Sequence, residues 1–349
     1  MRAVVVSAVD TYALTDVPDP VVQAPTDAIV RVRATTVCGS DAHLIAGHMG
    51  PIPPEGFPLG HEFVGEVVEV GAAVLDVAPG DRVAAPAAPW CGTCPACRAG
   101  QIQRCMRGGI FGAGPAFGGL GGAQAELVRV PWADSCLSLV PDGVSDAQAL
   151  TVGDILSTGW TAVKQAVTAP GQTLVVFGAG PVGLSAVHSA RLHGVRQVIA
   201  IDTIPERLEL ALAMGADHTV DPSSVDVAGT VADLTGGRGA EAVVDAAGVP
   251  ATIAAWVDVA ALGARVGMVG IPAGPVPLVL GALQMKNVSL WTGLGDLGHM
   301  DMLLEMIAAG RLDPSPMFTA TVPFDGIEAA IADFVARKPG LVKQLVTVP

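Results

Sequence analysis

Four cysteines lie close together in the chain and have the spacing of metal ligands. Gaps of two residues let one turn present successive thiolates to a tetrahedral metal ion, and the longer last gap returns the fourth ligand. Because four thiolates fill the coordination shell, the pattern predicts a structural zinc site with no position for a substrate. Four cysteines also hold iron or an iron–sulfur cluster in other proteins, but nothing nearby suggests an electron-transfer partner. The four residues are Cys91, Cys94, Cys97 and Cys105.

A second set of metal-ligand types, Cys38, His61 and Glu62, stands earlier in the chain. One cysteine, one histidine and one carboxylate form an open zinc site that leaves a position for a substrate oxygen. Each residue also has an ordinary interpretation, as a buried thiol, a hydrogen-bonded core histidine and a turn residue. The three residues by themselves leave this choice open. Cys136 stands alone and is expected to pack as a small apolar side chain.

A glycine pattern typical of dinucleotide binding follows an apolar stretch at 173–177. The glycines allow a tight turn, a close approach of the backbone to a pyrophosphate and close packing of helix on strand. Free amides at the start of the following helix then hold the phosphates. The pattern alone is weak in a chain with 43 glycines, but its place between a strand and a helix strengthens it. The residues expected at the cofactor are Gly178, Gly180, Pro181, Val182 and Gly183.

An acidic residue, Asp202, ends the next predicted strand, about twenty residues after the glycines. A carboxylate in this place accepts hydrogen bonds from the ribose hydroxyls of NAD and repels the 2′-phosphate of NADP. The sequence therefore predicts NAD as the cofactor. Arg207 follows five residues later and either lies across the adenine or is solvated. The alternative is a glycine-rich turn without a ligand, with Asp202 capping a helix.

The elements that position these groups change in character along the chain. The first part holds short β-like runs between turns rich in glycine and proline, which predicts an irregular β-rich domain. Later, apolar strands alternate with helix-like segments, which predicts a parallel sheet covered by helices on both faces. A final strand at 341–348 has no obvious place in that sheet and is expected to return to the first domain. The expected strands are 3–6, 28–34, 63–70, 82–84, 126–130, 173–177, 197–201, 242–247 and 264–270, and the expected helices 181–193, 205–214, 252–261, 301–309 and 326–336.

Length and composition exclude several classes of protein. A chain of 349 residues favours two domains. It is 51% hydrophobic, but the long uncharged run at 266–285 holds three prolines and four glycines, so we expect no transmembrane helix. A net charge of −14 argues against binding to nucleic acid or anionic lipid. The first ten residues resemble a strand rather than a signal peptide, and metal-ligand cysteines suit the reducing cytoplasm.

The segment GHEFVGEVVEVGAAV at 60–74 resembles the GHE-x2-G-x5-G-x2-V signature of zinc-containing alcohol dehydrogenases in the medium-chain dehydrogenase/reductase superfamily. The order of motifs also matches, because CGSDAH at 38–43 precedes GHE, and the four cysteines and GAGPVG follow it. The resemblance covers essentially the whole chain. It implies an α/β fold in which a Rossmann doubly wound parallel sheet, 157–295, is inserted into a GroES-like β-rich catalytic domain formed by 1–156 and 296–349. It also implies two zinc ions per subunit, one catalytic and one structural.

The resemblance assigns roles residue by residue. Cys38 and His61 match two ligands of the catalytic zinc, Glu62 matches a carboxylate that approaches the metal during ligand exchange, and GDILSTGWTAVK at 153–164 implies Asp154 as the last ligand. Polyol dehydrogenases of the superfamily tend instead to use a glutamate near GHE, so Asp154 leans away from them. The further implied contacts are Thr158 on the nicotinamide, Val269, Gly270 and Ile271 on its carboxamide, Lys343 near the pyrophosphate, and Leu294 with Ala87 and Ala88 at the pocket wall.

The resemblance implies reversible hydride transfer between NAD and a primary or secondary alcohol, with the aldehyde or ketone as product. Zinc lowers the pKa of the bound alcohol, and the resulting alkoxide gives up hydride. Ser40 matches the relay hydroxyl and His43 the outer proton acceptor, although a turn hydroxyl and a surface histidine are the ordinary interpretations. The other histidines match nothing catalytic and are expected to be structural or solvated; they are His48, His188, His193, His218 and His299.

Alternatives remain within and outside this class. Within it, the chain could be a polyol or amino-alcohol dehydrogenase, or an aldehyde dismutase that keeps its NAD bound. Outside it, a sensor or scaffold that binds zinc and NAD without catalysis is conceivable, but no matched position is damaged. The zinc-free reductases of the superfamily are disfavoured by Cys38, His61 and both zinc patterns. Relatives imply a homo-oligomer, a tetramer in preference to a dimer.

Overall fold

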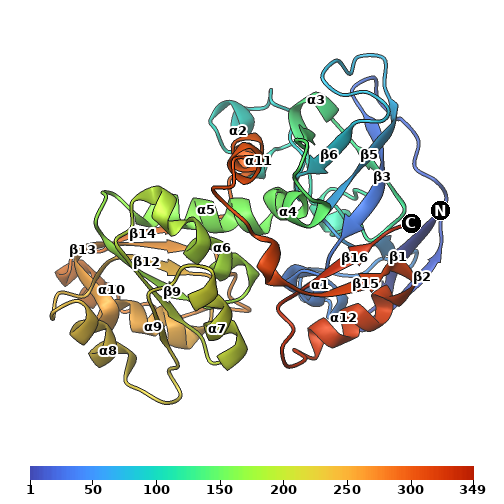
Figure 1. The fold of residues 1–349 in the computed structure, drawn as a ribbon. Helices are drawn as coiled ribbons and strands as arrows, with labels where there is room; N and C mark the ends of the chain where they lie inside the picture. The colour runs from blue at the N-terminus through green and yellow to red at the C-terminus, as the bar shows by residue number, and fades with distance from the viewer. The chain divides into compact units, whose positions relative to one another are not determined.

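The computed structural model describes residues 1–349, and they form two compact units. The first, which we call the split unit, contains Met1–Asp154 and Asp296–Pro349. The second, the inserted unit, contains Ile155–Gly295 and separates those segments in the sequence. In Figure 1 the split unit is blue to green and red, whereas the inserted unit is green to orange. No helix of either unit is long and apolar enough to cross a membrane.

The split unit is built on β-sheets. Its larger sheet has the strand order β15-β16-β3-β5-β6-β8, with β7 also paired to β3, and its smaller sheet has the order β2-β1-β4. The strands of the larger sheet are β3 (Ala28–Thr35), β5 (Phe63–Val70), β6 (Arg82–Ala85), β7 (Leu127–Val130), β8 (Ser138–Leu139), β15 (Phe318–Pro323) and β16 (Lys343–Thr347). Those of the smaller sheet are β1 (Arg2–Ala8), β2 (Thr11–Asp16) and β4 (Phe57–Pro58).

The last strand returns to the first part of the chain, as expected. In β16, Val346 pairs with Thr35 and Thr347 with Ala34, antiparallel to β3. The same strand runs parallel to β15 on its other side. Strand β16 therefore brings the C-terminal segment against the strand that leads to Cys38.

Strands β3 and β5 carry the core of the split unit. Val30 and Val32 of β3 are buried while Arg31 between them is exposed, as the alternation of side chains along a strand requires. Phe63 of β5 meets the ring of Phe111 edge to face, with centroids 5.4 Å apart and an angle of 89° between the rings. Aromatic pairs prefer this arrangement because the positive ring edge faces the negative ring face.

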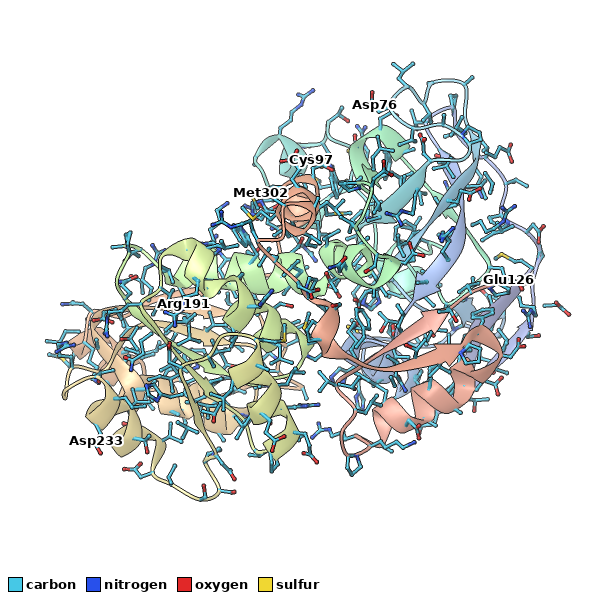
Figure 2. All side chains as sticks on the ribbon, in the orientation of Figure 1. Asp76, Cys97, Glu126, Arg191, Asp233 and Met302 are labelled. Atoms are coloured by element: carbon cyan, nitrogen blue, oxygen red, sulfur yellow. The ribbon has the colours of Figure 1, made fainter.

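A glutamate adds a side-chain link between the N-terminal strand and the rest of the unit. The carboxylate of Glu126 accepts hydrogen bonds from both the backbone amide and Nε of Arg2, each at 2.8 Å. Figure 2 labels Glu126 beside the N-terminal strands. The pair ties β1 to the segment that precedes β7, 124 residues later in the chain.

Helices of the split unit are short and lie between strands or near the C-terminus (Figure 1). They are α1 (Gly39–Ile45), α2 (Pro95–Arg98), α3 (Ala133–Cys136), α4 (Asp146–Leu150), α11 (Met300–Ala308) and α12 (Ile327–Val335). Figure 2 labels Cys97 on α2 and Met302 on α11.

The inserted unit is a six-stranded parallel sheet with helices packed on it. Its strand order is β11-β10-β9-β12-β13-β14, so the chain moves outward from β9 first to one side and then to the other. Ligands bind at such a switch point, at the carboxyl ends of the strands. The strands are β9 (Thr173–Phe177), β10 (Gln197–Ile201), β11 (His218–Val220), β12 (Ala240–Asp245), β13 (Ala260–Met268) and β14 (Ser289–Thr292).

Strand β9 is buried along its whole length, which explains its uninterrupted apolar sequence. The helices around the sheet are α5 (Ile155–Ala166), α6 (Pro181–Ser189), α7 (Pro205–Ala213), α8 (Val227–Leu234), α9 (Pro250–Val259) and α10 (Leu280–Met285). The helix expected at 181–193 is α-helical only to Ser189 and continues as a 3-10 turn, Ala190–His193, before Gly194 at a φ of 79°. Glycine takes this left-handed conformation at helix ends without steric cost.

Candidate metal centres and cofactor site

Three short segments of the split unit carry the Cys/His/carboxylate set. Cys38 is the N-cap of α1, and its amide donates to the carboxylate of Asp41, three residues later, at 2.9 Å. This bond fixes the start of the helix and hence the position of the thiol. Cys38 thus follows β3 directly through a short connection.

His61 and Glu62 precede β5 and depend on Gly60. Gly60 has a φ of +100°, and a Cβ there would lie 2.6 Å from the backbone nitrogen of Gln124. Any other residue would therefore be strained and would push the two segments apart. The carbonyl of Glu62 accepts a hydrogen bond from the hydroxyl of Thr35 at 2.8 Å, which ties this segment to the end of β3.

Asp154 ends the 3-10 helix η3 (Thr151–Gly153). A Cβ at Gly153 would collide with the carbonyl of Ala85 at the end of β6, and the amide of Ala87 donates to the Gly153 carbonyl at 2.9 Å. Close packing of this glycine on β6 holds Asp154 beside the other two segments.

The four side chains converge on one point. Ligand atoms of Cys38, His61, Glu62 and Asp154 all lie within 4.8 Å of one another. Asp154 Oδ2 is 3.4 Å from His61 Nε2 and 3.8 Å from Cys38 Sγ. Oε2 of Glu62 is buried with no hydrogen-bond partner. A thiol, an imidazole and two carboxylates gathered in a buried place offer the donors that zinc prefers, so the residues fit this metal.

Burial makes charge on this set costly without a cation. It raises the pKa of the Cys38 thiol, to which the charge of Glu62 adds. Burial likewise raises the pKa of Glu62, and Lys343 opposes that rise only in part. For His61, burial disfavours the imidazolium, but the charges of Asp41 and Cys38 outweigh it and raise the pKa well above its usual value. A bound divalent cation would stabilise the deprotonated ligands.

Asp41 holds the imidazole of His61 from behind. Its Oδ1 lies 3.3 Å from His61 Nδ1, and its Oδ2 accepts a hydrogen bond from Gln124 Nε2 at 2.9 Å. A carboxylate on Nδ1 favours the tautomer in which Nε2 carries the lone pair for a metal. Sequence reasoning missed both Asp41 and Gln124. Asp41 carried one usable signal, because it stands three residues after a cysteine ligand and on a short helix.

Lys343 lies against Glu62. Both side chains are 1% exposed, and the ammonium of Lys343 is 2.8 Å from Glu62 Oε1 and 3.4 Å from the carbonyl of Val37. Burial lowers the pKa of this ammonium, but the charges of Glu62, Cys38 and Asp154, together with the hydrogen bond to Glu62, raise it overall. The sequence had led us to expect Lys343 near a pyrophosphate. The structure instead shows it buried as the counter-charge of Glu62, a contact that no motif predicted.

The relay candidates lie on α1. Ser40 Oγ is 3.3 Å from His61 Nε2, so the hydroxyl stands beside the converging ligand atoms. His43 is one helical turn further on, and residues three apart lie on the same helix face. Ser40 and His43 are both half-buried.

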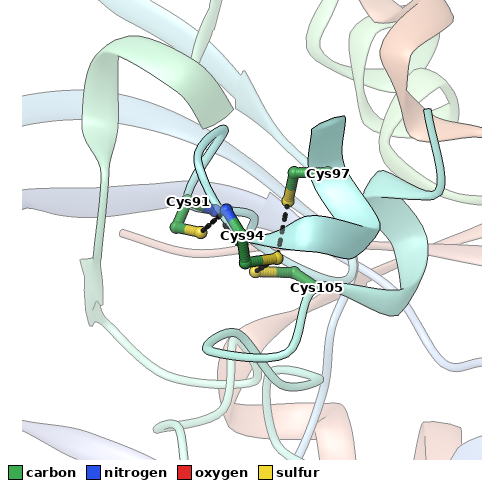
Figure 3. Close-up of side chains that lie close together, drawn as sticks. All are labelled: Cys91, Cys94, Cys97 and Cys105. Carbon is green, nitrogen blue, oxygen red and sulfur yellow. Dashed lines mark hydrogen bonds between the residues drawn. The ribbon is translucent and has the colours of Figure 1, made fainter. Parts of the chain in front are cut away.

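The four-cysteine lobe forms a second centre (Figure 3). Sγ of Cys94 is 3.5 Å from that of Cys97 and 3.9 Å from that of Cys105. Four thiolates at about 2.3 Å from a tetrahedral zinc would have sulfurs about 3.8 Å apart, which agrees with these distances. The amides of Cys91 and Cys94 donate to sulfurs of the lobe, at 3.3 and 3.4 Å. None of the four thiols forms a disulfide, so the lobe fits a structural zinc.

The environment of the lobe lowers the pKa of one thiol and raises that of another. For Cys91, burial opposes ionisation, but hydrogen bonds from the amide and hydroxyl of Thr93 help lower its pKa to about 6. For Cys97, burial and its neighbours Cys94 and Cys105 raise the pKa to about 12. Cys136 lies outside the set: burial raises its pKa to about 12, and its sulfur accepts a bond from the Trp90 amide at 3.2 Å.

In the inserted unit, the glycine turn follows β9 at the switch point. Gly178 has a φ of +86°, and a Cβ at Gly183 would collide with the Gly178 carbonyl. Gly180 is the N-cap of α6 and Pro181 its first residue, where the missing amide hydrogen costs no helical bond. The turn therefore has the shape that places backbone amides against phosphates.

Asp202 ends β10 close to this turn. Its Oδ2 accepts from the Ala179 amide at 2.7 Å, and its Oδ1 from the Ile204 amide at 3.0 Å. Arg207 lies beside it, with Nη1 3.9 Å from Asp202 Oδ2, and the same nitrogen is 3.9 Å from where a Cβ of Gly180 would be. The carboxylate thus also has the capping contacts that the sequence offered as an alternative to ribose binding.

The remaining candidates lie at the same end of the sheet or near it. The amides of Val269 and Gly270 both donate to the Asp245 carbonyl, at 3.0 and 2.9 Å, which fixes the turn after β13. Ile271 follows with an exposed side chain. Thr158 of α5 lies next to Gly295, the residue after Leu294. These residues belong to the inserted unit, whereas Lys343 belongs to the split unit.

Comparison with known proteins settles the family. The model of the alcohol dehydrogenase GroES-like domain matches residues 24–142, and that of the zinc-binding dehydrogenases matches 181–306. An alcohol dehydrogenase of Cupriavidus necator is 35% identical over 98% of this chain and 97% of its own. The chain belongs to the zinc-dependent alcohol dehydrogenase family. Both the resemblance to medium-chain dehydrogenases/reductases and the expected fold, a GroES-like domain with an inserted Rossmann domain, are confirmed.

Solved structures of zinc-type alcohol dehydrogenases and their relatives have the same fold. The alcohol dehydrogenase TADH from Thermus sp. ATN1 covers 100% of this chain and of its own, with a TM-score of 0.95 and 38% identity. A zinc-binding dehydrogenase structure from Sinorhizobium meliloti 1021 covers 99% of this chain and 98% of its own, with a TM-score of 0.87 and 28% identity, and is bound to NADP. The family therefore fixes the class of oxidoreductase, and its members include one that holds NADP.

Proposed function

We propose that this zinc-type alcohol dehydrogenase transfers hydride reversibly between NAD and a primary or secondary alcohol, with an aldehyde or ketone as product. The observation that carries the proposal is the convergence of Cys38, His61, Glu62 and Asp154, with the Ser40 hydroxyl 3.3 Å from His61 Nε2. This combines a metal-ligand set with a proton-transfer group at one point. No residue of the matched family pattern is lost, which speaks against a non-catalytic sensor.

Each side chain of the set has a distinct part in this proposal. A zinc ion held by Cys38, His61 and Asp154 would supply Lewis-acid polarisation of the substrate oxygen. Asp41 orients His61 through Nδ1, and Lys343 neutralises Glu62 and holds it near the other ligands. Ser40 accepts the hydroxyl proton of the substrate, and His43 is the outer acceptor on the same helix face. The four-cysteine lobe would hold a second, structural zinc.

Cofactor choice rests on Asp202. Its carboxylate ends β10 beside the glycine turn, where it would accept ribose hydroxyls and repel a 2′-phosphate. We therefore propose NAD, although a relative binds NADP and Arg207 lies close by. The cofactor residues that we propose are Thr158, Gly178, Gly180, Pro181, Val182, Gly183, Asp202, Arg207, Val269, Gly270, Ile271 and Leu294. Lys343 is not among them, because its ammonium is buried against Glu62.

We also propose a homo-oligomer, a tetramer in preference to a dimer. Strand β14 is an unpaired edge of the parallel sheet, and Leu290 on it is 41% exposed. Leu280 and Met285 nearby are exposed as well, and Leu280 and Leu290 line an open cavity of about 450 Å³. Exposed apolar surface beside a strand edge is typical of protein–protein contacts. Thiols that hold metal ions also favour a reducing compartment, which supports the cytoplasm.

The deciding experiment follows nicotinamide absorbance while the zinc-loaded protein meets a panel of primary and secondary alcohols, aldehydes and ketones. NAD and NADP are supplied in parallel. Turnover of alcohols with NAD and little with NADP is the expected result, and an Asp202→Ala variant should narrow the difference between the two cofactors. Preference for NADP in the wild-type protein would overturn the assignment of Asp202. No turnover of any alcohol or carbonyl compound would favour a sensor.

The same panel of alcohols, aldehydes and ketones also distinguishes an aldehyde dismutase from an ordinary dehydrogenase. A dismutase converts an aldehyde into alcohol and acid with cofactor that copurifies and never exchanges. Aldehyde consumption without added NAD would therefore replace the proposed reaction by dismutation.

A further inference from the structure

The end of helix α1 places two histidines together. Gly47 follows the C-cap Ala46 with a φ of +71°, the left-handed conformation that glycine adopts readily. Its amide donates to the Leu44 carbonyl at 3.0 Å, and the His48 amide donates to the His43 carbonyl at 2.9 Å. These two bonds define a Schellman motif, in which the second residue after the cap returns over the last turn of the helix.

In a Schellman motif the side chains at these two positions usually make an apolar contact. Here both are imidazoles. Nδ1 of His43 is 3.3 Å from Nδ1 of His48, and the ring centroids are 5.6 Å apart. Two ring nitrogens at this distance can form a hydrogen bond when one of them carries a hydrogen, so that one ring donates and the other accepts. An apolar cap contact has been replaced by a link that can carry a proton.

The side chains between the metal-ligand set and the cap of α1 differ in exposure. His61 is buried, Ser40 and His43 are half-buried, and His48 is exposed. A proton that leaves a buried site must reach bulk water, and imidazole is the side chain that gains and loses protons near neutral pH. His43 and His48 together lead from the half-buried face of α1 to solvent.

We propose that His48 is the outer member of the proton relay and passes the proton from His43 to water. This rests on the proposed alcohol oxidation and adds a residue to it. His48 touches neither substrate nor cofactor, and its effect passes through His43.

The transfer balances without any further reactant. His43 takes up a proton at Nε2 while its Nδ1–H bond breaks, and that hydrogen forms a new bond to Nδ1 of His48. His48, now an imidazolium, releases its Nε2 proton to water or buffer. After one proton has moved to water during alcohol oxidation, each imidazole again carries one ring proton and is neutral. Each ring is then in its other neutral tautomer. The starting tautomers are restored by exchange of ring protons with solvent, or by proton transfer in the reverse direction during carbonyl reduction.

The kinetic test compares His48→Gln with wild type, and uses His218→Gln as the matched control. Glutamine keeps a polar side chain at the cap but cannot be protonated, and His218 is a half-buried histidine of the inserted unit. The best alcohol of the panel is oxidised at saturating NAD, in ordinary and in deuterated water. Each measurement is repeated while the concentration of a bulky tertiary-amine buffer rises at constant ionic strength.

We expect His48→Gln to lower kcat by about tenfold, less than the loss of a group that transfers the proton in the reaction itself. The solvent isotope effect should grow, and buffer should restore most of the loss, because buffer can take the proton from His43 directly. A wild-type kcat would overturn the proposal. So would a lowered kcat that buffer does not restore, because that result indicates a structural role at the cap.

A second readout needs no turnover. Protein with ¹⁵N-labelled histidine shows by NMR whether each Nδ1 carries a proton, and His43→Gln and His48→Gln assign the two rings. We expect one protonated and one bare Nδ1 in the pair at neutral pH, and a changed Nδ1 signal of His43 in His48→Gln. Independent Nδ1 signals would overturn the link. Coupled signals in a protein that oxidises no alcohol would instead overturn the proposed function.

Discussion

Three of the four side chains at the proposed catalytic zinc site, His61, Glu62 and Asp154, are held by residues that are not themselves ligands. Asp41 lies behind His61, Lys343 neutralises Glu62, and Gly153 packs Asp154 against β6. In a buried site such supports matter, because side chains without them would turn away or lose their charge. Glu62 shows how burial and neighbouring charges oppose each other: burial raises its pKa, while Lys343 and His61 counteract that rise.

Asp41→Ala should weaken zinc binding at this site alone. Without the carboxylate, His61 loses the partner that fixes its tautomer, and losses of such partners cost about 10–100-fold in metal affinity or activity. We expect one of two zinc ions to pass more readily to a colorimetric chelator, with kcat falling in parallel. Asp233→Ala, an exposed position on α8, serves as control and should release zinc like wild type. Equal chelation of Asp41→Ala and wild type would show that Asp41 does not support the site.

At the scale of elements, turns and helix caps position most of the side chains of the proposed site. Gly47 turns the chain so that His48 meets His43, and Gly60 lets the His61 segment pass close to Gln124. Strand β16 contributes Lys343 from the far end of the chain. The four-cysteine lobe is held by amide–sulfur bonds and by a small apolar cluster in which Trp90, Ile102 and Trp132 pack against its thiols.

The lobe should lose its metal when one thiolate is removed. Cys105→Ser should lower the zinc content by one equivalent per chain and lower the thermal midpoint by several degrees, because a structural metal contributes directly to folding. Cys136→Ala is a matched control, since that sulfur bonds to Trp90 and not to the set. Zinc content is measured by atomic emission. If Cys105→Ser still bound the full amount of zinc, Cys105 would not be a zinc ligand.

The Arg2–Glu126 pair predicts a pH-dependent contribution to stability. Burial raises the pKa of Glu126, but bonds from the amide and guanidinium of Arg2 outweigh it and lower the pKa below 4.5. The stabilisation is therefore complete above about pH 4.5 and is lost as the pH falls through the lower pKa of the folded state. Glu126→Gln should cost about 0.5–1 kcal/mol at neutral pH, since the pair is partly exposed.

Urea unfolding at a series of pH values checks this expectation. The difference in unfolding free energy between Glu126→Gln and wild type should close as the pH falls through the lowered pKa of Glu126, and Glu69→Gln, an exposed position of β5, should show no such trend. A difference that persists unchanged in acid would mean that packing, and not the charge, stabilises this contact.

At the scale of the whole molecule, the exposed apolar edge of the inserted unit favours an oligomer over a monomer. Leu280, Met285 and Leu290 leave a large apolar surface in water beside strand β14. Single exposed leucines are common in folded proteins, but a cluster next to an open strand edge favours aggregation unless another chain covers it.

Leu290→Arg should therefore break the proposed assembly. A charge at this edge would have to be buried without a partner, which opposes association strongly. Size-exclusion chromatography with light scattering should show a species of at most half the wild-type mass, with an unchanged far-ultraviolet circular dichroism spectrum. Leu75→Arg, an exposed leucine of the split unit, controls for added charge. An unchanged mass would place the interface elsewhere.

Local patterns in the sequence predicted one metal site, the cofactor turn and the family of this protein. Spacing predicted the four-cysteine lobe, and the strand–glycine–helix pattern predicted the switch point after β9, because both depend on contacts within a few residues. Prolines and glycines in the apolar run at 266–285 led us to expect no membrane-spanning helix, and the order of motifs indicated the family. Strand β14 and helix α8 were missed, since a few residues carry too little periodicity to identify. The segment of the longer helix α5 was matched only as a family motif and was not predicted as a helix.

Only the tertiary structure decided the contacts between distant segments. Asp41 and Gln124 are 83 residues apart, and Glu62 and Lys343 are 281 apart, so no local pattern could pair them. The family resemblance placed Lys343 near a pyrophosphate; the fold buries it beside Glu62 instead. His48 was expected to be structural or solvated; its side chain is exposed, and the cap of α1 also brings it to His43. The sequence sets which chemical groups are present, but the free energy of burying charge depends on neighbours that only the fold brings together.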